Sequence, residues 1–312
     1  MSLQKSFFCT TRTLKTPVLF LIFNRPDVTQ KVFSAIRVAQ PSKLYIAADG
    51  PRQKIHEEKE RCNKTRKIIE QVDWDCEVKT MFRENNLGCK KAVSEAINWF
   101  FEDEPEGIIL EDDCLPSQSF FWFCQELLEH FRDDQNIGAI CGFYSNELDY
   151  RANTSYFFSR YLRVWGWAGW RRTLNGYSSN FNNLIENKNN WKDKNFSRTN
   201  ILLKQYWQQM FDEVNNGNID TWDAQLQYLL WQKKQLSVVS SKNLIQNIGW
   251  LEGAHAHTKD HNHDLPAREI NFPLVHLENV LRDARADKVI EQKSYRITTL
   301  AYLKKLFGNL IR

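Results

Sequence analysis

The chain has 312 residues, of which 42% are hydrophobic and 26% charged, as in an ordinary globular protein of one large or two small domains. Its net charge of +4, without a long basic stripe, argues against a nucleic-acid-binding protein. Seven cysteines without a C-x-x-C pair, no signal peptide and no membrane-length apolar run favour a cytoplasmic protein with reduced thiols.

In its first half the chain alternates apolar runs with helical patterns after a loose leader over residues 1–15. Short apolar runs predict strands at 17–23, 43–48, 76–82, 107–110 and 137–141. Apolar residues at helical spacing predict helices at about 28–38, 56–71, 90–101 and 117–132. This order is typical of a parallel, Rossmann-like sheet flanked by helices. No G-x-G-x-x-G follows any strand, which argues against a dinucleotide dehydrogenase.

Polar clusters follow three of these strands: Asn24-Arg25, Asp49 with Arg52, and Glu111–Asp113. Ligands of open α/β sheets bind beyond the carboxyl ends of the strands, so these clusters are expected to line one crevice. Three adjacent acids repel one another unless water or a hard cation lies between them. The triplet therefore predicts a metal and phosphate site, although it also fits a polar loop that caps the following helix.

The second half is aromatic and irregular. Residues 150–177 are rich in aromatic residues and arginine, and 178–200 are expected to form a surface excursion. Helices are predicted at about 200–215, 222–234 and 294–311, with a short strand at Val238-Val239 and a histidine-bearing loop at 247–258. Aromatics reach 13%, with 11 tryptophans, which is typical of sugar or nucleotide pockets but also of a tryptophan-rich core.

Several short motifs stand in one order along residues 17–260. They are Phe23–Arg25, Asp49, Asn86–Gly88, Glu111–Asp113, Trp165–Trp167, Thr221–Asp223 and Asn247–Gly249, the last leading to His257-Thr258. In this order the chain resembles the GT-A fold, nucleotide-sugar-dependent glycosyltransferases. It is most similar to the group that includes N-acetylglucosaminyltransferase I and related bacterial sugar transferases.

The resemblance implies a donor site for a nucleotide sugar, expected to be a UDP-sugar. Asp113 would bind the Mn²⁺ or Mg²⁺ that bridges the diphosphate, and Asp112 would hydrogen-bond the ribose or the sugar. Asp49 would contact the base, and Arg25 would lie near the nucleotide. The other residues expected to bind the donor are Asn24, Arg83, Glu111 and Trp167.

On the acceptor side the resemblance implies that Asp223 is the general base that deprotonates a hydroxyl of a glycan or glycolipid, with inversion. The family carries two adjacent aspartates in this segment, whereas Ala224 follows Asp223 here, and we choose Asp223 over Asp220. Asp223 also fits an ordinary acid in the first turn of a helix.

Four histidines lie close together after this segment. His257 would close over the metal and phosphates, and the roles of His255, His261 and His263 stay open, as does a zinc site.

The predicted organisation is a nucleotide-sugar-binding half at 1–148, an acceptor-side half of the same GT-A domain at 149–265, and a C-terminal extension at 266–312. The basic amphipathic helix within 294–312 either rests on the inner face of an anionic membrane or packs on protein. Two other functions stay open on this fold: a sugar-nucleotide nucleotidyltransferase and a non-catalytic carbohydrate-binding protein.

Overall fold

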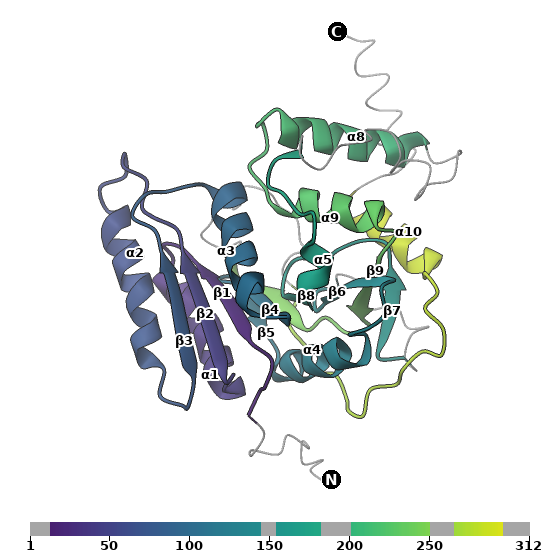
Figure 1. Ribbon diagram of the computed structural model, residues 1–312, viewed down its shortest axis with the longest axis horizontal. Coiled ribbons are helices and arrows are strands. Elements are labelled where there is room, and N and C mark those ends of the chain that lie inside the picture. The colour runs from purple at the N-terminus through teal and green to yellow at the C-terminus, as the bar shows by residue number, and fades with distance from the viewer. Residues whose placement is uncertain (1–12, 145–153, 182–200, 250–264, 296–312) are drawn as a thin grey trace.

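An eight-stranded mixed sheet forms the centre of the protein (Figure 1). The computed structural model describes residues 13–144, 154–181, 201–249 and 265–295. The strands are β1 (Val18–Ile22), β2 (Lys43–Ala48), β3 (Glu77–Phe82), β4 (Glu106–Glu111), β6 (Ile137–Cys141), β7 (Tyr156–Ser159), β8 (Trp167–Trp170) and β9 (Leu236–Ser240). Their order across the sheet is β3-β2-β1-β4-β8-β6-β9-β7.

The parallel sheet predicted for the first half is confirmed for β3, β2, β1 and β4, which are neighbours and run in one direction. Between β4 and β6 lies β8, which is antiparallel to both. At the far edge β7 pairs antiparallel with β9. Both antiparallel strands come from the aromatic segment 150–177, where their four-residue length gave too short a pattern to predict. Because β8 pairs with β4, one sheet runs through both predicted halves of the domain.

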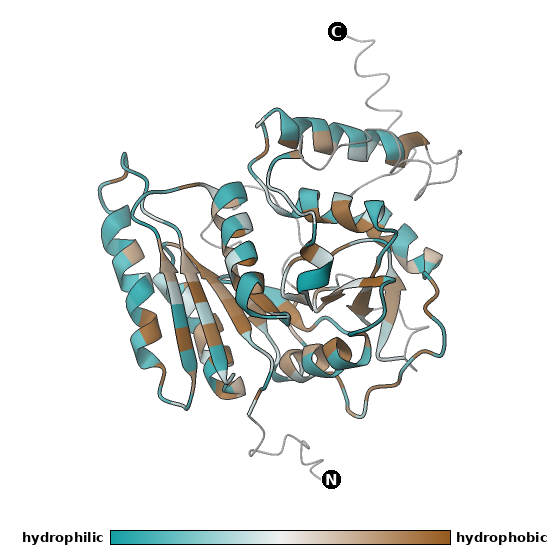
Figure 2. Ribbon diagram, viewed as in Figure 1, coloured by the Kyte–Doolittle hydropathy of each residue, from teal (hydrophilic) through white to brown (hydrophobic). Residues whose placement is uncertain are grey.

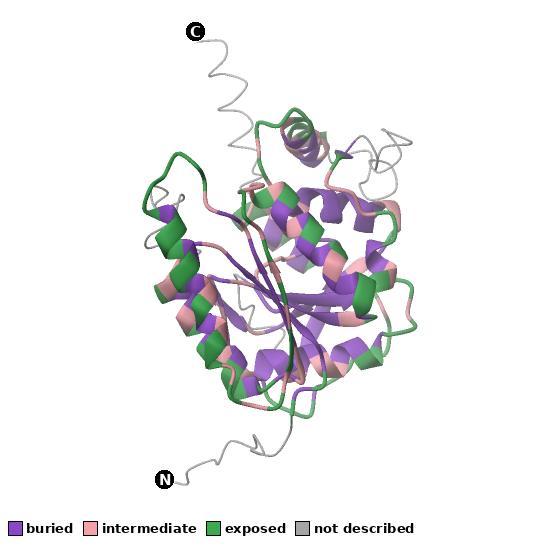
Figure 3. Ribbon diagram, turned by 60° about the vertical axis from the view of Figure 1, so that its left-hand side comes forward, coloured by how far each residue is buried: buried purple, intermediate pink, exposed green. Residues whose placement is uncertain are grey.

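Helices cover both faces of the sheet. They are α1 (Pro26–Ala39), α2 (Glu58–Lys67), α3 (Cys89–Asp103), α4 (Gln118–His130), α5 (Arg171–Leu174), α8 (Ile201–Asn215), α9 (Asp223–Gln232) and α10 (Ala284–Lys293), with a 3-10 turn at Ile68–Gln71. Strand residues alternate between the faces. Val18 and Phe20 join the apolar cluster of α1 and α4, whereas Leu19 and Leu21 join that of α3, α8 and α9. Figure 2 shows apolar residues concentrated in the strands, and Figure 3 shows the buried sheet between half-exposed helices.

A second, two-stranded sheet lies just beyond the end of β4. It consists of β5 (Cys114–Pro116) and β10 (Ile245–Asn247), which pair antiparallel, with Asn247 opposite Cys114. The pairing continues one residue further, because the Ile248 amide donates to the Asp113 carbonyl at 2.8 Å. This small sheet therefore brings the start of the 247–258 segment against the acid triplet.

The C-terminal part differs from the prediction, because a helix forms at Ala284–Lys293, before the predicted 294–311 segment. The Asp283 side chain caps it by accepting from the Ala286 amide at 2.8 Å, and Ala286 and Ile290 are buried. Its few apolar residues do lie at helical spacing, with Ala286 and Ile290 one turn apart, but the pattern is short. Residues 296–312 lie outside the described residues, so the amphipathic helix there stays a prediction. Among the residues that the structure describes, no helix is long and apolar enough to span a bilayer.

Candidate active site

The acid triplet lies at the carboxyl end of β4, where the chain turns into β5. Asp112 is only 3% exposed. Arg25, the residue before α1, donates from Nη2 to Asp113 Oδ2 at 3.0 Å and also to Asp112 Oδ1. The second oxygen of Asp112, Oδ2, is buried and has no partner among the described residues. One guanidinium thus balances three carboxylates, which leaves an excess of negative charge at this point.

The pKa values show the cost of this crowding. Burial, together with the charges of Asp113, Asp112 and Asp223, raises the pKa of Glu111 to about 8. Burial also raises the pKa of Asp112 to about 6, although Arg25 acts in the opposite direction. A bound cation would reverse this effect by stabilising the ionised carboxylates.

The donor atoms fit the Mn²⁺ or Mg²⁺ that the resemblance implies. Hard divalent cations prefer oxygen ligands, and Asp112 Oδ2 is a buried carboxylate oxygen without a partner. Within the described ranges, no group of three or more His, Cys, Asp or Glu side chains converges on a metal position. The site therefore suits an ion held by about one or two carboxylates and completed by water and substrate phosphates, which is how Mg²⁺ is commonly bound.

Gly249 packs directly against the triplet. A Cβ atom at this position would lie 2.3 Å from Asp113 Oδ2 and 2.7 Å from Arg25 Nη1. Both distances are shorter than van der Waals contact, so any larger residue must displace the carboxylate or the guanidinium. The glycine thus fixes the position of the predicted metal ligand.

We expect Gly249→Ala to weaken Mn²⁺-dependent UDP binding about tenfold or more, because displacing a ligand by about 1 Å is costly in an organised site. Isothermal titration calorimetry with UDP, with and without Mn²⁺, measures this effect. Gly176→Ala is the control for UDP affinity: its positive φ of 88° makes an alanine there strained, so stability should fall, but a Cβ meets only Leu229 Cδ1, at 3.9 Å, and UDP affinity should not change. Unchanged UDP affinity in Gly249→Ala would show that nucleotide binding does not use the triplet.

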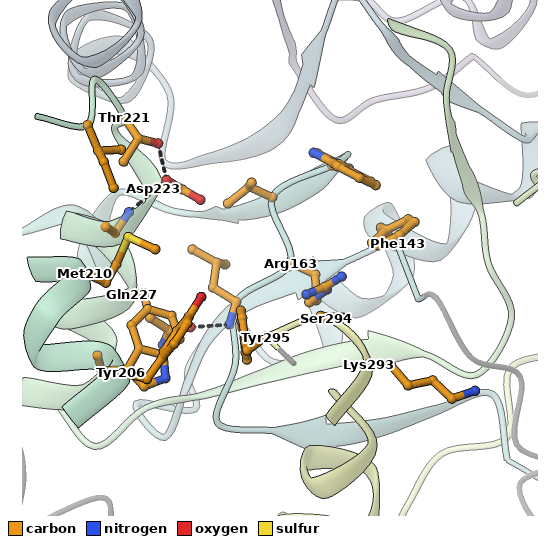
Figure 4. Close-up of a pocket in the computed structure, with 16 residues that line it drawn as sticks. Phe143, Arg163, Tyr206, Met210, Thr221, Asp223, Gln227, Lys293, Ser294 and Tyr295 are labelled. Atoms are coloured by element: carbon orange, nitrogen blue, oxygen red, sulfur yellow. Dashed lines mark hydrogen bonds between the residues drawn. The ribbon is translucent and has the colours of Figure 1, made fainter. Parts of the chain in front are cut away.

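Asp223 begins α9 and lies near the triplet, since its charge contributes to the raised pKa of Glu111. Its Oδ1 accepts from the Ala224 amide at 3.0 Å and from the Thr221 hydroxyl. Asp223 also lines a cavity of about 330 Å³ (Figure 4). The described lining residues that carry aromatic rings are Phe143, Trp165, Tyr206, Trp207 and Tyr295, and those that carry positive charge are Arg163 and Lys293. The wall of the cavity therefore contains a carboxylate and the flat apolar faces of aromatic rings.

Asp220 has a different position from Asp223. Its carboxylate accepts from the Cys89 amide at 2.9 Å and the Lys90 amide at 3.0 Å, so it caps the first turn of α3. These bonds tie the loop before α9 to the loop between β3 and α3. Asp223 rather than Asp220 lines the cavity, and its role as the base stays a prediction.

Three of the predicted donor-binding residues lie at one edge of the sheet: Asn24 after β1, Asp49 after β2 and Arg83 after β3. Each of these side chains forms hydrogen bonds within the protein. Asn24 donates to Glu58 Oε1 at 2.7 Å, and Arg83 donates to Glu95 Oε2 at 3.2 Å.

The Asp49 carboxylate accepts from the Leu87 amide at 3.0 Å, the Gly88 amide at 3.2 Å and Asn86 Nδ2 at 2.9 Å. In this arrangement Asp49 holds the Asn86–Gly88 loop.

We expect Asp49→Asn to lower the free energy of unfolding by about 1–3 kcal/mol, because the amide nitrogen cannot accept the loop hydrogen bonds. Chemical denaturation measures this loss. UDP affinity, measured by calorimetry at a temperature where the variant is folded, separates the two roles of this residue. A large loss of UDP affinity with unchanged stability would favour the base contact over the loop contact.

The prediction that Trp167 contacts the donor does not fit its position. Its side chain is 1% exposed in β8, at the middle of the sheet, and its ring stacks on Trp222 at a centroid distance of 6.0 Å. Trp165, two residues earlier and outside the strand, lines the cavity instead. Both residues belong to one Trp-Gly-Trp motif, so the sequence could not tell which of them faces a ligand.

The predicted histidines His255, His257, His261 and His263 lie outside the described residues, and the metal role of His257 stays a prediction. The residues that line the cavity with Asp223 and that sequence reasoning missed include Arg163, Tyr206 and Tyr295. Arg163 belongs to the aromatic, arginine-rich segment, which was a usable signal. Tyr206 and Tyr295 lie in or beside predicted helices, and no sequence signal marked them as cavity residues.

The sequence matches no family model and no curated protein. Among the solved structures with a partial likeness to this chain are three. A 4-diphosphocytidyl-2C-methyl-D-erythritol synthase from Anaerococcus prevotii is 9% identical at a TM-score of 0.31, over 51% of this chain and 73% of the other. HddC from Yersinia pseudotuberculosis is 8% identical at a TM-score of 0.33, over 52% and 80%.

The third structure is a UDP-glucose pyrophosphorylase complexed with UDP-glucose, 10% identical at a TM-score of 0.26, over 46% of this chain and 62% of the other. Likenesses this low do not bear on the activity of this chain. The protein has an α/β fold with a mostly parallel central sheet flanked by helices, as a Rossmann-like nucleotide-binding fold has.

Proposed function

We propose that the protein is a metal-dependent glycosyltransferase that moves a sugar from a nucleotide donor, expected to be a UDP-sugar, to a hydroxyl of a glycan or glycolipid. One observation carries this proposal. The acid triplet at the end of β4 lies near Asp223, a fourth carboxylate, which lines an aromatic cavity. A diphosphate site beside a base in a sugar-sized cavity is what transfer from a nucleotide sugar requires.

On the donor side, Asp113 and Asp112 would hold the divalent cation together with the diphosphate oxygens. The cation supplies positive charge that stabilises the leaving nucleoside diphosphate. Arg25 positions both carboxylates through its two hydrogen bonds, and Gly249 leaves room for them. The cation would therefore lie at the end of β4, and the diphosphate of the donor would bind to the cation.

On the acceptor side, Asp223 would accept the proton of the attacking hydroxyl. Its Oδ1 is held by the Ala224 amide and the Thr221 hydroxyl, while no described residue donates to its Oδ2. We therefore assign Oδ2 of Asp223 as the atom that accepts the proton. The acceptor oxygen bonds to the anomeric carbon as the bond from that carbon to the diphosphate breaks, and the anomeric centre inverts.

A sugar-nucleotide nucleotidyltransferase, the enzyme class that the sequence leaves open, is the second candidate. That reaction joins a sugar 1-phosphate to a nucleoside triphosphate, so the site must neutralise several phosphates. Arg25, the cation beside the triplet, is already paired with Asp112 and Asp113. The segment after β1, Asn24–Asp27, also lacks the glycine-rich basic loop expected for that class.

The test is incubation with a panel of nucleotide sugars, followed by measurement of released nucleoside diphosphate with Mn²⁺ and with EDTA. The proposal expects Mn²⁺-dependent release of UDP that rises when sugar acceptors are added. Pyrophosphate release from UTP and a sugar 1-phosphate would favour the nucleotidyltransferase. No thermal shift with any nucleotide would remove both enzymes and leave the carbohydrate-binding reading.

A further inference from the structure

We infer that the cavity beside Asp223 binds a sugar unit that carries an anionic group, and that Arg163 recognises that group. This inference rests on the proposed function, because it names the class of acceptor at the same site. The cavity, at about 330 Å³, is near the lower end of the range for ligand pockets, about 300–1,000 Å³, which suits a single sugar unit.

Arg163 is a half-buried cation without an anionic partner. Its guanidinium lies over the Phe143 ring, 5.0 Å from the ring centroid, and its backbone amide donates to Cys141 Sγ at 3.4 Å. No carboxylate of the described residues forms an ion pair with it, and its Nε is buried without a hydrogen-bond partner. A partly desolvated charge is costly unless it is paired. An anionic ligand group would supply the missing partner, because a guanidinium binds carboxylate and phosphate with two parallel hydrogen bonds.

The walls around Arg163 are aromatic and packed against one another. Tyr295 lies with its ring centroid 5.6 Å from that of Tyr206 and 5.1 Å from that of Trp207. Burial and the charge of Asp223 raise the pKa of Tyr206 to about 12, so its hydroxyl stays protonated as a hydrogen-bond donor. Such rings offer flat apolar faces to the C–H side of a sugar and polar tips to its hydroxyls.

The charged groups that line the cavity give it a direction: Asp223 is negative, and Arg163 and Lys293 are positive. Figure 4 shows Asp223 on one side, at the start of α9, and Arg163 on the other, between Phe143 and Tyr295. A carboxylate on the ligand is repelled by Asp223 and attracted by Arg163. The anionic end of the sugar therefore lies toward Arg163, and a neutral hydroxyl lies toward the base. This orientation selects which hydroxyl is placed for reaction.

The experiment compares three probes that differ in one substituent: methyl β-glucoside, methyl β-glucuronide and methyl β-glucoside 6-phosphate. Ligand-observed NMR titrations of the full chain, with and without UDP and Mn²⁺, give their affinities. We expect an anionic probe to bind about tenfold or more tightly than the neutral one, as a charged hydrogen-bonded contact predicts. The glucuronide and the phosphate arms distinguish the two kinds of anionic group.

Variants tie the preference to Arg163. Arg163→Gln is expected to abolish the preference for anionic probes with little change for the neutral one, and Arg163→Lys to restore part of it. Arg285→Gln, at an exposed arginine on α10, is the control and keeps the preference. Equal binding of neutral and anionic probes, or an intact preference in Arg163→Gln, would overturn the inference.

Two further results separate this inference from the proposed function. If Arg163→Gln lowers UDP affinity as much as probe affinity, Arg163 belongs to the donor site and the inference is wrong. If the anionic preference depends on Arg163 but no nucleotide sugar is turned over, the cavity assignment stands and the proposed transfer fails.

Discussion

Replacing Asp223 by asparagine is expected to lower the rate of sugar transfer by about 10²–10⁴-fold, the contribution of a general base, while UDP binds as in the wild type. The amide keeps the size of the side chain and an oxygen that can accept from the Ala224 amide, so the start of α9 is preserved. It cannot take up the proton of the acceptor hydroxyl. Turnover of a nucleotide sugar and calorimetric titration with UDP, measured on the same preparation, check both halves of this prediction.

Asp212→Asn is the control for Asp223→Asn, because Asp212 is an exposed carboxylate on the neighbouring helix α8. It is expected to leave both turnover and UDP affinity unchanged. Weakened UDP binding in Asp223→Asn would place this carboxylate in the donor site and contradict its assignment as the base. Full turnover in that variant would assign the base to another residue.

Asp113→Asn is expected to change activity and stability in opposite directions. Removing the proposed metal ligand should lower Mn²⁺-dependent turnover by about 10³-fold, because neutralisation of the leaving diphosphate is lost. The metal-free protein should become more stable by about 1 kcal/mol, since Asp113 contributes to the raised pKa of Glu111 and its charge crowds the triplet. A rise of about 2 °C in Tm in the presence of EDTA would correspond to this gain.

Asp133→Asn, at an exposed carboxylate in the turn after α4, is the matched control and should change neither property. A lower Tm in Asp113→Asn would mean that the bond from Arg25 at 3.0 Å outweighs the repulsion within the triplet. Full Mn²⁺-dependent turnover in this variant would remove Asp113 from the metal site.

The first half of the fold was predictable because the sequence pattern of each element agrees with its place in the sheet. Strands β1, β2 and β4 are short apolar runs, whereas β3 is an edge strand of mixed sequence, and polar residues mark where each one ends. The edge of the sheet at which Arg25, Asp49 and Asp113 gather follows from the parallel order alone. By contrast β8 joins the sheet only through pairing with distant strands, and no pattern within four residues could reveal that.

The chemistry of individual side chains was less predictable than their location. The carboxylate of Asp49 stands where a ligand contact was expected, yet its hydrogen bonds hold the Asn86–Gly88 loop. Which tryptophan of the Trp165–Trp167 motif faces the cavity depends on where β8 begins. The cavity itself is assembled from segments far apart in the sequence, including Arg163, Tyr206 and Tyr295. Such a site exists only after packing, so sequence spacing does not encode it.

Phosphorus NMR of the reaction mixture tests the central claim most directly, because it identifies the bond that breaks. The protein is incubated with the nucleotide sugar that gives turnover, Mn²⁺ and an acceptor, and the spectrum is followed with time. The account predicts that the donor resonances decline as those of UDP grow, and that EDTA stops the change. Formation of UMP and a sugar 1-phosphate in place of UDP, or of UTP and a sugar 1-phosphate when pyrophosphate is added, would contradict it.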